Sequence, residues 1–404
     1  MTLSEELTWR GFYNQTTLDN ITDLDTTKRN FYWGVDPSAD SMHIGQLALA
    51  MMVKHFINHG YKAVLLVGGA TGVIGDPDGK SQERDLKALD EITKNKAGIA
   101  AQYNKLFDGQ EFELVDNYDW FKNVGFLDFL RDVGKNFSMT QLLDRDFVQK
   151  RIGEGGSGIS YAEFSYSLIQ GYDFLHLFRE KGVTLQIAGA DQWGNSISGV
   201  HLIKRLESAE TDVYTAPLVI NKSTGTKFGK SEAGAIWLDE AKTSVFDFYQ
   251  FFLNTSDDNV IDYLKLFTML TQEEVEELEQ KQQEDSAGRQ AQKTLAYEVT
   301  ATAHGKDRAG SVRLATEALF ADTSSVDLSE EQKDSLVKEL PSVAAGDSVI
   351  KALAESEFAS SLGEARRMIE AGSISIDGNK ILEDCPLESG QLVKKGKNNF
   401  LIVK

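Results

Sequence analysis

The chain has 404 residues, 41% of them hydrophobic, which is enough to bury a large core and to form two to four domains. A formal net charge of −20 argues against long-range attraction to polyanions, so any nucleic acid has to bind through local basic patches. The single cysteine, Cys385, rules out internal disulfides and cysteine-rich metal sites, and we expect no metal site. The longest apolar run, 63–67, is too short to cross a membrane, and the acidic N-terminal segment is unlike a transit peptide, so we expect a cytoplasmic protein.

Strand and helix patterns alternate through the first half of the chain. A strand over 27–35, a helix over 44–58 and a strand over 62–67 are typical of a parallel βαβ unit. Further predicted elements are helices over 91–106, 124–137, 146–152 and 161–180, and strands over 111–115 and 184–188. Together they predict an α/β domain with a doubly wound parallel sheet (Rossmann-like) over residues 1–220.

The pattern becomes helical after this region. The predicted segments are a connector over 221–243, a helical domain over 244–325, a linker over 326–347 and a small α+β module over 348–404. The acidic run 273–277 is most simply a solvated helix face. In the last module we expect a helix over 362–371, and an alternating strand over 373–376 that enters an Asp377-Gly378 turn.

The first candidate site is His43-Ile44-Gly45-Gln46, at the predicted start of a helix that follows a strand. Free backbone N–H groups and the positive end of the helix dipole favour a phosphate chain there, and glycine allows close approach. Taken alone, a histidine at a helix start is more often an ordinary cap.

Two glycine-containing loops are further candidates. Residues 68–80 follow the second strand and should face the same crevice as His43, although a long turn with positive φ is the alternative, and the Walker pattern is absent. In the loop 226–231, the ammonium groups of Lys227 and Lys230 can neutralise a triphosphate, although a solvated basic loop is the commoner explanation. The rare pairing of this loop with the His-x-Gly helix start points to nucleotide chemistry.

With these segments the chain resembles the bacterial tyrosyl-tRNA synthetases, which are class I aminoacyl-tRNA synthetases, over almost its full length. The family signatures HIGH and KMSKS stand here as His43-Ile44-Gly45-Gln46 and Lys227-Phe228-Gly229-Lys230-Ser231. Further family-like blocks follow in order at residues 68–80, 117–120, 164–166, 170–174 and 191–195.

The resemblance implies that tyrosine attacks the α-phosphate of ATP, giving tyrosyl-adenylate and pyrophosphate, and that the tyrosyl group then passes to the 3′-terminal adenosine of tRNA(Tyr). ATP enters as a substrate with Mg²⁺, and no tightly bound cofactor is implied. Such catalysis consists of positioning and charge stabilisation. The residues implied at the reacting phosphates are His43, Lys80, Arg84, Lys227 and Lys230. The residues implied for ATP binding are His43, Gly45, Gln46, Asp191, Lys227, Lys230 and Ser231.

The amino-acid contacts that the resemblance implies are Tyr32 and Asp173 for the phenolic hydroxyl, Asp76, Tyr166 and Gln170 for the ammonium group, and Asp36 and Gln192 close by. Asp173 is the clearest of these from the residues alone, because an acid in an otherwise apolar stretch needs a partner. A site that demands a hydrogen bond rejects phenylalanine by about 10⁴- to 10⁵-fold.

Three residues depart from the family pattern. Gln46 replaces the second histidine of HIGH but can still donate a hydrogen bond to the nucleotide. Trp33 stands where the family usually has a small residue near the ribose, so we expect a reshaped adenosine pocket. Leu49 stands where the family often has a polar residue.

The resemblance also implies a homodimer in which one tRNA bridges both subunits, with an interface helix over 124–137. The helical domain is then expected to read the anticodon stem, and residues 348–404 resemble a small RNA-binding domain also found in a ribosomal small-subunit protein. The candidate tRNA contacts, for which a solubilising surface is the alternative interpretation, are Lys204, Arg205, Arg366, Arg367, Lys394, Lys395 and Lys397.

The function predicted from the sequence is therefore that of a tyrosine–tRNA ligase. The main alternative, motivated by Gln46 and Trp33, is a catalytically weakened RNA-binding or regulatory paralogue. A ligase for tryptophan is disfavoured by Tyr32 with Asp173. A small-molecule nucleotidyltransferase does not explain residues 240–404.

Overall fold

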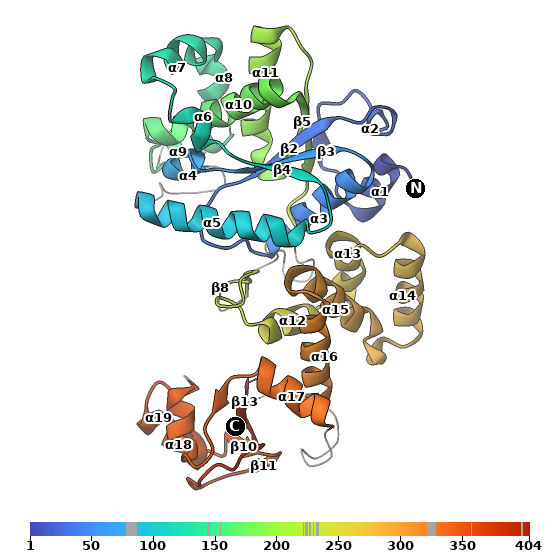
Figure 1. Ribbon diagram of the computed structural model, residues 1–404, viewed down its shortest axis with the longest axis vertical. Coiled ribbons are helices and arrows are strands. Elements are labelled where there is room, and N and C mark those ends of the chain that lie inside the picture. The colour runs from blue at the N-terminus through green and yellow to red at the C-terminus, as the bar shows by residue number, and fades with distance from the viewer. Residues whose placement is uncertain are drawn as a thin grey trace. The chain divides into compact units, whose positions relative to one another are not determined.

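The structure of the protein is a computed structural model. It describes residues 1–77, 87–143, 146–153, 155–220, 222, 225, 228, 230–231, 234–320, 329–356, 358–396 and 399–404. The chain forms two compact units. The first consists of Met1–Asp239 with Ser256–Ala291, and the second of Glu240–Thr255 with Gln292–Lys404. Each unit contains its own main sheet (Figure 1).

The first unit is built on a six-stranded sheet with the strand order β1-β6-β5-β2-β3-β4. Its strands are β1 Gln15–Thr16, β2 Asn30–Val35, β3 Lys62–Val67, β4 Phe112–Asp116, β5 Val183–Gly189 and β6 Asp212–Ala216. All pairings are parallel except that of the short edge strand β1 with β6. From β2 the chain winds outward through β3 and β4 in one direction, and through β5 and β6 in the other. The carboxyl ends of β2 and β5 therefore flank the point where a ligand crevice is expected.

Helices cover both faces of this sheet, which confirms the predicted doubly wound architecture. In Figure 1, α3 and α5 lie on one face and α10 and α11 on the other. The α-helices of the first unit are α1 Leu3–Arg10, α2 Asp23–Thr26, α3 Ile44–Asn58, α4 Thr71–Ile74, α5 Leu89–Leu106, α6 Tyr118–Phe121, α7 Phe126–Asp132, α8 Met139–Leu143, α9 Asp146–Ile152, α10 Tyr161–Lys181, α11 Trp193–Glu207, α13 Asp257–Phe267 and α14 Gln272–Glu284. Covered on both faces, the central strands are almost continuously apolar and buried, as in KAVLLV of β3.

Local signals explain where these helices begin and end. The Ser160 side chain accepts a hydrogen bond from the backbone of Glu163 and caps the start of α10, while Gly182, with φ +61°, ends it. The helix predicted over 124–137 is shorter, because the structure ends α7 at Asp132 and continues as a 3₁₀ turn, Gly134–Asn136. Glycine at that point disfavours a continued helix.

The residues predicted to form one helical domain, 244–325, are divided between the two units. Helices α13 and α14 belong to the first unit, where α13 packs beside α1 and α3. A small hairpin of the first unit, β7 Lys230–Ser231 with β8 Gly234–Ala235, precedes them in the chain. The remaining helices of that stretch are α12 Val245–Leu253, α15 Gln290–His304 and α16 Lys306–Phe320.

The second unit contains a five-stranded sheet with the order β11-β10-β12-β13-β9. Its further elements are α17 Glu330–Glu339, β9 Ser342–Val343, α18 Val349–Glu355, α19 Leu362–Glu370, β10 Ile374–Ile376, β11 Asn379–Lys380, β12 Leu392–Lys395 and β13 Asn399–Val403. The predicted linker over 326–347 is therefore, in its described part, a helix and a sheet strand. Strand β9 pairs with β13, and the Lys404 backbone N–H donates to the Val343 carbonyl at 2.8 Å.

The terminal module has its own apolar core, to which α18, α19 and alternate residues of β10, β12 and β13 contribute. The predicted tight turn is present, because Asp377 and Gly378 both have positive φ, at +49° and +81°, as a two-residue hairpin requires. Within the part of the chain that the structure describes, no helix combines the length and the apolar composition needed to span a bilayer.

Candidate active site

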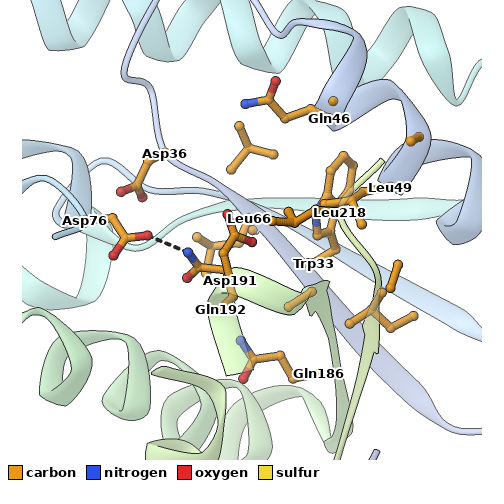
Figure 2. A pocket seen from close by; sticks show the side chains of 18 of the residues that line it. Trp33, Asp36, Gln46, Leu49, Leu66, Asp76, Gln186, Asp191, Gln192 and Leu218 are labelled. Atoms are coloured by element: carbon orange, nitrogen blue, oxygen red, sulfur yellow. Dashed lines mark hydrogen bonds between the residues drawn. The ribbon is translucent and has the colours of Figure 1, made fainter. Parts of the chain in front are cut away.

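A cavity of about 450 Å³ opens at the carboxyl ends of β2 and β5, where the strand order reverses. Every residue that was predicted to bind the amino acid lines it, namely Tyr32, Asp36, Asp76, Tyr166, Gln170, Asp173 and Gln192. The predicted nucleotide residues that line it are His43, Gly45, Gln46 and Asp191. Figure 2 shows part of this lining and the segments that contribute it.

One end of the cavity is negatively charged. Asp36, just after β2, accepts hydrogen bonds from the Thr71 hydroxyl at 2.6 Å and from the Tyr166 hydroxyl at 2.7 Å. Asp76 accepts from the Gln192 side chain, as the dashed line in Figure 2 marks, and from Asn195 Nδ2 at 3.3 Å. Two carboxylates at one end of a cavity suit a cationic group such as an ammonium.

Another part of the cavity lining holds a buried acid beside a buried phenol. Asp173, 2% exposed on α10, accepts hydrogen bonds from Trp120 Nε1 at 2.9 Å and from Asn117 Nδ2 at 3.1 Å. Burial outweighs these two neutral donors and raises the pKa of Asp173 well above its usual value. The Tyr32 hydroxyl is buried without a hydrogen-bond partner among the described residues, and burial together with Asp173 raises its pKa. This part of the lining therefore keeps hydrogen-bonding capacity for a polar ligand group.

Asn117 links Asp173 to Asp36 through Thr71, a role that was not predicted from the sequence. It is fully buried just after β4, and its Nδ2 donates both to Asp173 and to the Thr71 hydroxyl, each at 3.1 Å. Its Oδ1 accepts from the Ala70 backbone N–H at 2.6 Å, and Thr71 in turn donates to Asp36. The available signal was position, since polar residues directly after β3 and β4 lie at the same sheet edge as the cavity.

Gln186 was also missed. It is 3% exposed on β5, is the register neighbour of Tyr32 on β2, and lines the cavity. Its Oε1 has no hydrogen-bond partner among the described residues. A polar residue between the buried Leu185 and Ile187 was the signal that could have found it, because an unpaired amide is costly inside an apolar strand.

His43 caps the start of α3. Its Nδ1 accepts from the Gly45 backbone N–H at 3.0 Å, so in the neutral ring Nε2 carries the proton and can donate to an anionic oxygen. The His43 backbone N–H donates to Gln46 Oε1 at 2.9 Å, so the glutamine that departs from the family signature completes a capping box. A Cβ at Gly45 would lie 2.7 Å from His43 Cε1 and would displace the imidazole.

Trp33 contributes an apolar wall. It is 2% exposed, and its indole packs edge-on against Tyr103 and Phe107, with ring centroids 5.4 Å and 6.4 Å away. The bulk of the side chain is therefore accommodated in an aromatic core between the sheet and α5. Leu49 and Leu218 also line the cavity, on the same side as Trp33 in Figure 2.

The cations of the second signature are placed only in part. Lys80, Arg84 and Lys227 lie outside the described residues, and so do the side chains of Lys230 and Ser231. The backbone of the last two forms β7, and Phe228 lines the cavity. Convergence of these cations on the phosphates stays a prediction.

The predicted tRNA residues lie away from the cavity lining. Lys204 and Arg205 are exposed on α11, where Lys204 pairs with Glu210 at 2.8 Å. In the second unit, Arg366 and Arg367 are exposed on α19. The other basic candidates there are half-buried or outside the described residues: Lys394, whose ammonium lies 5.1 Å from the Phe400 ring centroid, Lys395, which donates to the Phe358 carbonyl at 2.6 Å, and Lys397, which is not described.

Comparison with known proteins gives consistent matches. A family model described as tRNA synthetases class I (W and Y) matches residues 24–321. Tyrosine–tRNA ligase 2 of Bacillus cereus is 42% identical, and tyrosine–tRNA ligase of Limosilactobacillus reuteri is 40% identical, each over the full length of both chains. A C-terminally truncated mitochondrial tyrosyl-tRNA synthetase of Aspergillus nidulans superposes with a TM-score of 0.71 at 32% identity, covering 79% of this chain and 94% of that one.

Proposed function

The chain belongs to the class I tRNA synthetases that include the tryptophan and tyrosine enzymes, and we propose that it is a tyrosine–tRNA ligase. The observation that carries this choice is the Tyr32 hydroxyl beside Asp173, which has no hydrogen-bond partner among the described residues. A phenol can donate to the carboxyl group of Asp173 and accept from Tyr32, whereas an indole N–H can only donate. Phenylalanine would leave both groups unpaired, which a buried site rejects strongly.

In the activation step, the ammonium group of tyrosine lies among Asp76, Tyr166 and Gln170, with Asp36 and Gln192 adjoining. This arrangement leaves the tyrosine carboxylate facing the nucleotide. One carboxylate oxygen attacks the α-phosphate of ATP, and the bond to the departing pyrophosphate breaks. Holding the two reactants in this orientation supplies much of the rate enhancement.

The phosphates lie at the start of α3, where His43 Nε2–H donates to them and the helix dipole adds favourable charge. Lys227 and Lys230, with Lys80 and Arg84, neutralise the pyrophosphate as it leaves. ATP enters with Mg²⁺, which accompanies the substrate. Asp191 and Gln46 bind the nucleoside side of the same cavity.

The acyl group then passes to the 3′-terminal adenosine of tRNA(Tyr), with Lys204, Arg205, Arg366 and Arg367 as phosphate contacts. A homodimer is supported by α7, where Phe126 and Leu127 are 66% and 77% exposed. Adjacent exposed apolar side chains of this kind are typical of a contact surface.

ATP–pyrophosphate exchange with each of the twenty amino acids tests the proposal. We expect exchange with tyrosine alone, and charging of tRNA(Tyr) by the same preparation. Exchange with tryptophan instead would overturn the substrate assignment. A folded protein without any exchange would indicate the catalytically weakened paralogue.

A further inference from the structure

We propose that helix α13, predicted from the sequence to belong to a tRNA-reading domain, serves amino-acid activation by positioning the loop of the second signature, with Tyr263 as the main positioning residue. This proposal rests on the proposed function, because the lysines of that loop are taken as phosphate ligands.

The aromatic residue of the second signature, Phe228, lies against α13. Its ring centroid is 4.2 Å from that of Tyr263 and 5.5 Å from that of Phe267. Its backbone N–H donates to the Val219 carbonyl at 2.9 Å, and both Phe228 and Val219 line the cavity. Phe228 therefore attaches the loop to the cavity wall on one side and to α13 on the other.

A second attachment lies near the start of the same loop. The Lys222 backbone N–H donates to Asn259 Oδ1 at 2.9 Å, and the Lys222 ammonium pairs with Asp262. Asn259 is 1% exposed and is itself held by its Nδ2, which donates to Ser256 Oγ at 2.6 Å. The connector 221–243 is thus held on α13 at two residues, Lys222 and Phe228.

The other end of α13 is held by Arg10, which is 3% exposed. Its Nη1 donates to the carbonyls of Lys265 and Thr268 at 2.9 and 3.1 Å, and its Nη2 donates to the Leu270 carbonyl at 2.7 Å. A cation at the C-terminal end of a helix satisfies free carbonyls and complements the helix dipole. Arg10 therefore fixes the position of α13 relative to α1.

The same cluster reaches α3, the helix that begins beside His43. Glu6 on α1 accepts hydrogen bonds from Arg10 Nε at 3.0 Å, from His55 Nδ1 at 3.0 Å and from His59 Nε2 at 2.7 Å. His55 lies in the last turn of α3, and His59 is its C-cap. Helix α3, which His43 caps, and helix α13, on which Phe228 packs, are consequently joined through this cluster. Phe228 of the second signature and the helix of the first signature therefore share a scaffold.

The ring of Tyr263 makes this contact, since its hydroxyl is buried without a hydrogen-bond partner among the described residues. We therefore expect Tyr263→Phe to behave like the wild-type chain. Tyr263→Leu removes the ring against which Phe228 packs, so the loop loses its contact with α13 at Phe228. Misplacement of a positioning group by about 1 Å costs on the order of 100-fold in rate. Because the attachment at Lys222 remains in Tyr263→Leu, we expect a smaller loss, of about tenfold in rate.

The test is ATP–pyrophosphate exchange by the full-length chain, with ATP and tyrosine varied separately. For Tyr263→Leu we expect kcat to fall about tenfold and the KM for ATP to rise, with the KM for tyrosine changed less than about twofold. Tyr249→Leu is the matched control, because Tyr249 is similarly buried at 2% but lies on α12 of the second unit. It should leave all three constants unchanged.

A double variant identifies the route of the effect. In a Lys230→Ala background, Tyr263→Leu should cost less than in the wild-type chain, because one of the two cations that it misplaces is already absent. Full additivity, an equal rise in the tyrosine KM, or unchanged kinetics of a folded Tyr263→Leu chain would each overturn the role of α13. If the leucine variant does not fold, Tyr263→Met supplies the same comparison with more volume retained. A wild-type chain without tyrosine-dependent exchange would instead overturn the proposed function.

Discussion

Two carboxylates of the first unit, the buried Asp173 at the cavity and the half-buried Glu6 on α1, have opposite environments. Among the described residues Asp173 accepts hydrogen bonds from neutral donors, Asn117 and Trp120, so burial dominates and raises its pKa. For Glu6, burial also acts to raise the pKa, but hydrogen bonds and charge from His55, with His59 and Arg10, outweigh it and lower the pKa. Deep burial with neutral donors favours the protonated form of Asp173, whereas partial burial with Arg10, His55 and His59 favours the ionised form of Glu6.

The difference distinguishes an acid that can bind a ligand, Asp173, from an acid that stabilises the fold, Glu6. Glu6 accepts hydrogen bonds from Arg10, His55 and His59. It thereby connects α1 to α3, and through Arg10 to α13. Asp173 lies beside an unpaired hydroxyl and keeps a lone pair that a ligand can use. Carboxyl groups with a pKa raised by burial in a cleft are typical of functional sites.

The largest expected effect that tests this comparison is on the discrimination between tyrosine and phenylalanine. Asp173→Ala should raise the tyrosine KM and lower the preference for tyrosine over phenylalanine by at least about 100-fold, since the hydrogen bond that rejects phenylalanine is lost. Exchange kinetics with both amino acids measure the ratio. Glu6→Gln is the control, and its ratio should equal that of the wild-type chain. An unchanged ratio in Asp173→Ala would remove this acid from the pocket.

The fold of the catalytic sheet was predictable from the sequence because its signals are local. The helix that starts after His43 and the strand KAVLLV are placed at their predicted residues, since apolar periodicity and caps define them. The division of residues 244–325 between two units was not predictable. It depends on Arg10 reaching the end of α13 from far away in the chain, and no local pattern reports such a contact.

Most roles in the candidate site were predicted from a resemblance. An acid in an apolar stretch identified Asp173 without any resemblance, because burial of an unpaired acid is costly. Asn117 and Thr71 could not be given roles, because their function is to bridge groups that come together only in three dimensions. Gln186 was detectable as a polar residue within a buried strand but was overlooked.

The next effect, on stability, tests the other acid. Glu6→Gln should lower the free energy of unfolding by about 2 to 3 kcal/mol, because it leaves the buried Arg10 without its anion, and the 17% exposure of Glu6 moderates the loss. Urea unfolding followed by tryptophan fluorescence measures this, since all five tryptophans, at positions 9, 33, 120, 193 and 237, lie in the first unit. A loss below about 0.5 kcal/mol would show that the cluster contributes little.

The pH dependence of the same measurement should differ in sign for the two acids. The lowered pKa of Glu6 means that its contribution is present above its ordinary pKa of 4.5 and is lost as the pH falls. The raised pKa of Asp173 means that it costs stability increasingly as the pH rises above 3.8. Below pH 4.5, Glu6→Gln should make the rise of stability with pH shallower. Above pH 3.8, Asp173→Asn should remove a fall of stability with pH and so make the overall slope more positive. A change of slope in the same direction would contradict the comparison.

The smallest predicted effect concerns a donor to Asp173. Trp120→Phe removes the Nε1–H that donates at 2.9 Å, but a phenyl ring can keep the stacking on His176, whose ring centroid lies 4.4 Å away. Loss of one neutral hydrogen bond, about 1 kcal/mol, should raise the tyrosine KM about fivefold. It should also raise the pKa of Asp173 further, because the ionised form loses a donor.

This second consequence distinguishes the hydrogen bond from packing. If ionised Asp173 accepts a hydrogen bond from the phenol of tyrosine, the acid limb of the pH profile of kcat/KM for tyrosine should move to higher pH in Trp120→Phe. It should not move in Trp9→Phe, a control outside the cavity lining. A lower kcat/KM with an unmoved limb would mean that Trp120 contributes only its ring. The hydrogen bonds of Asp173 would then affect its pKa less than the hydrogen bonds from Arg10, His55 and His59 affect the pKa of Glu6.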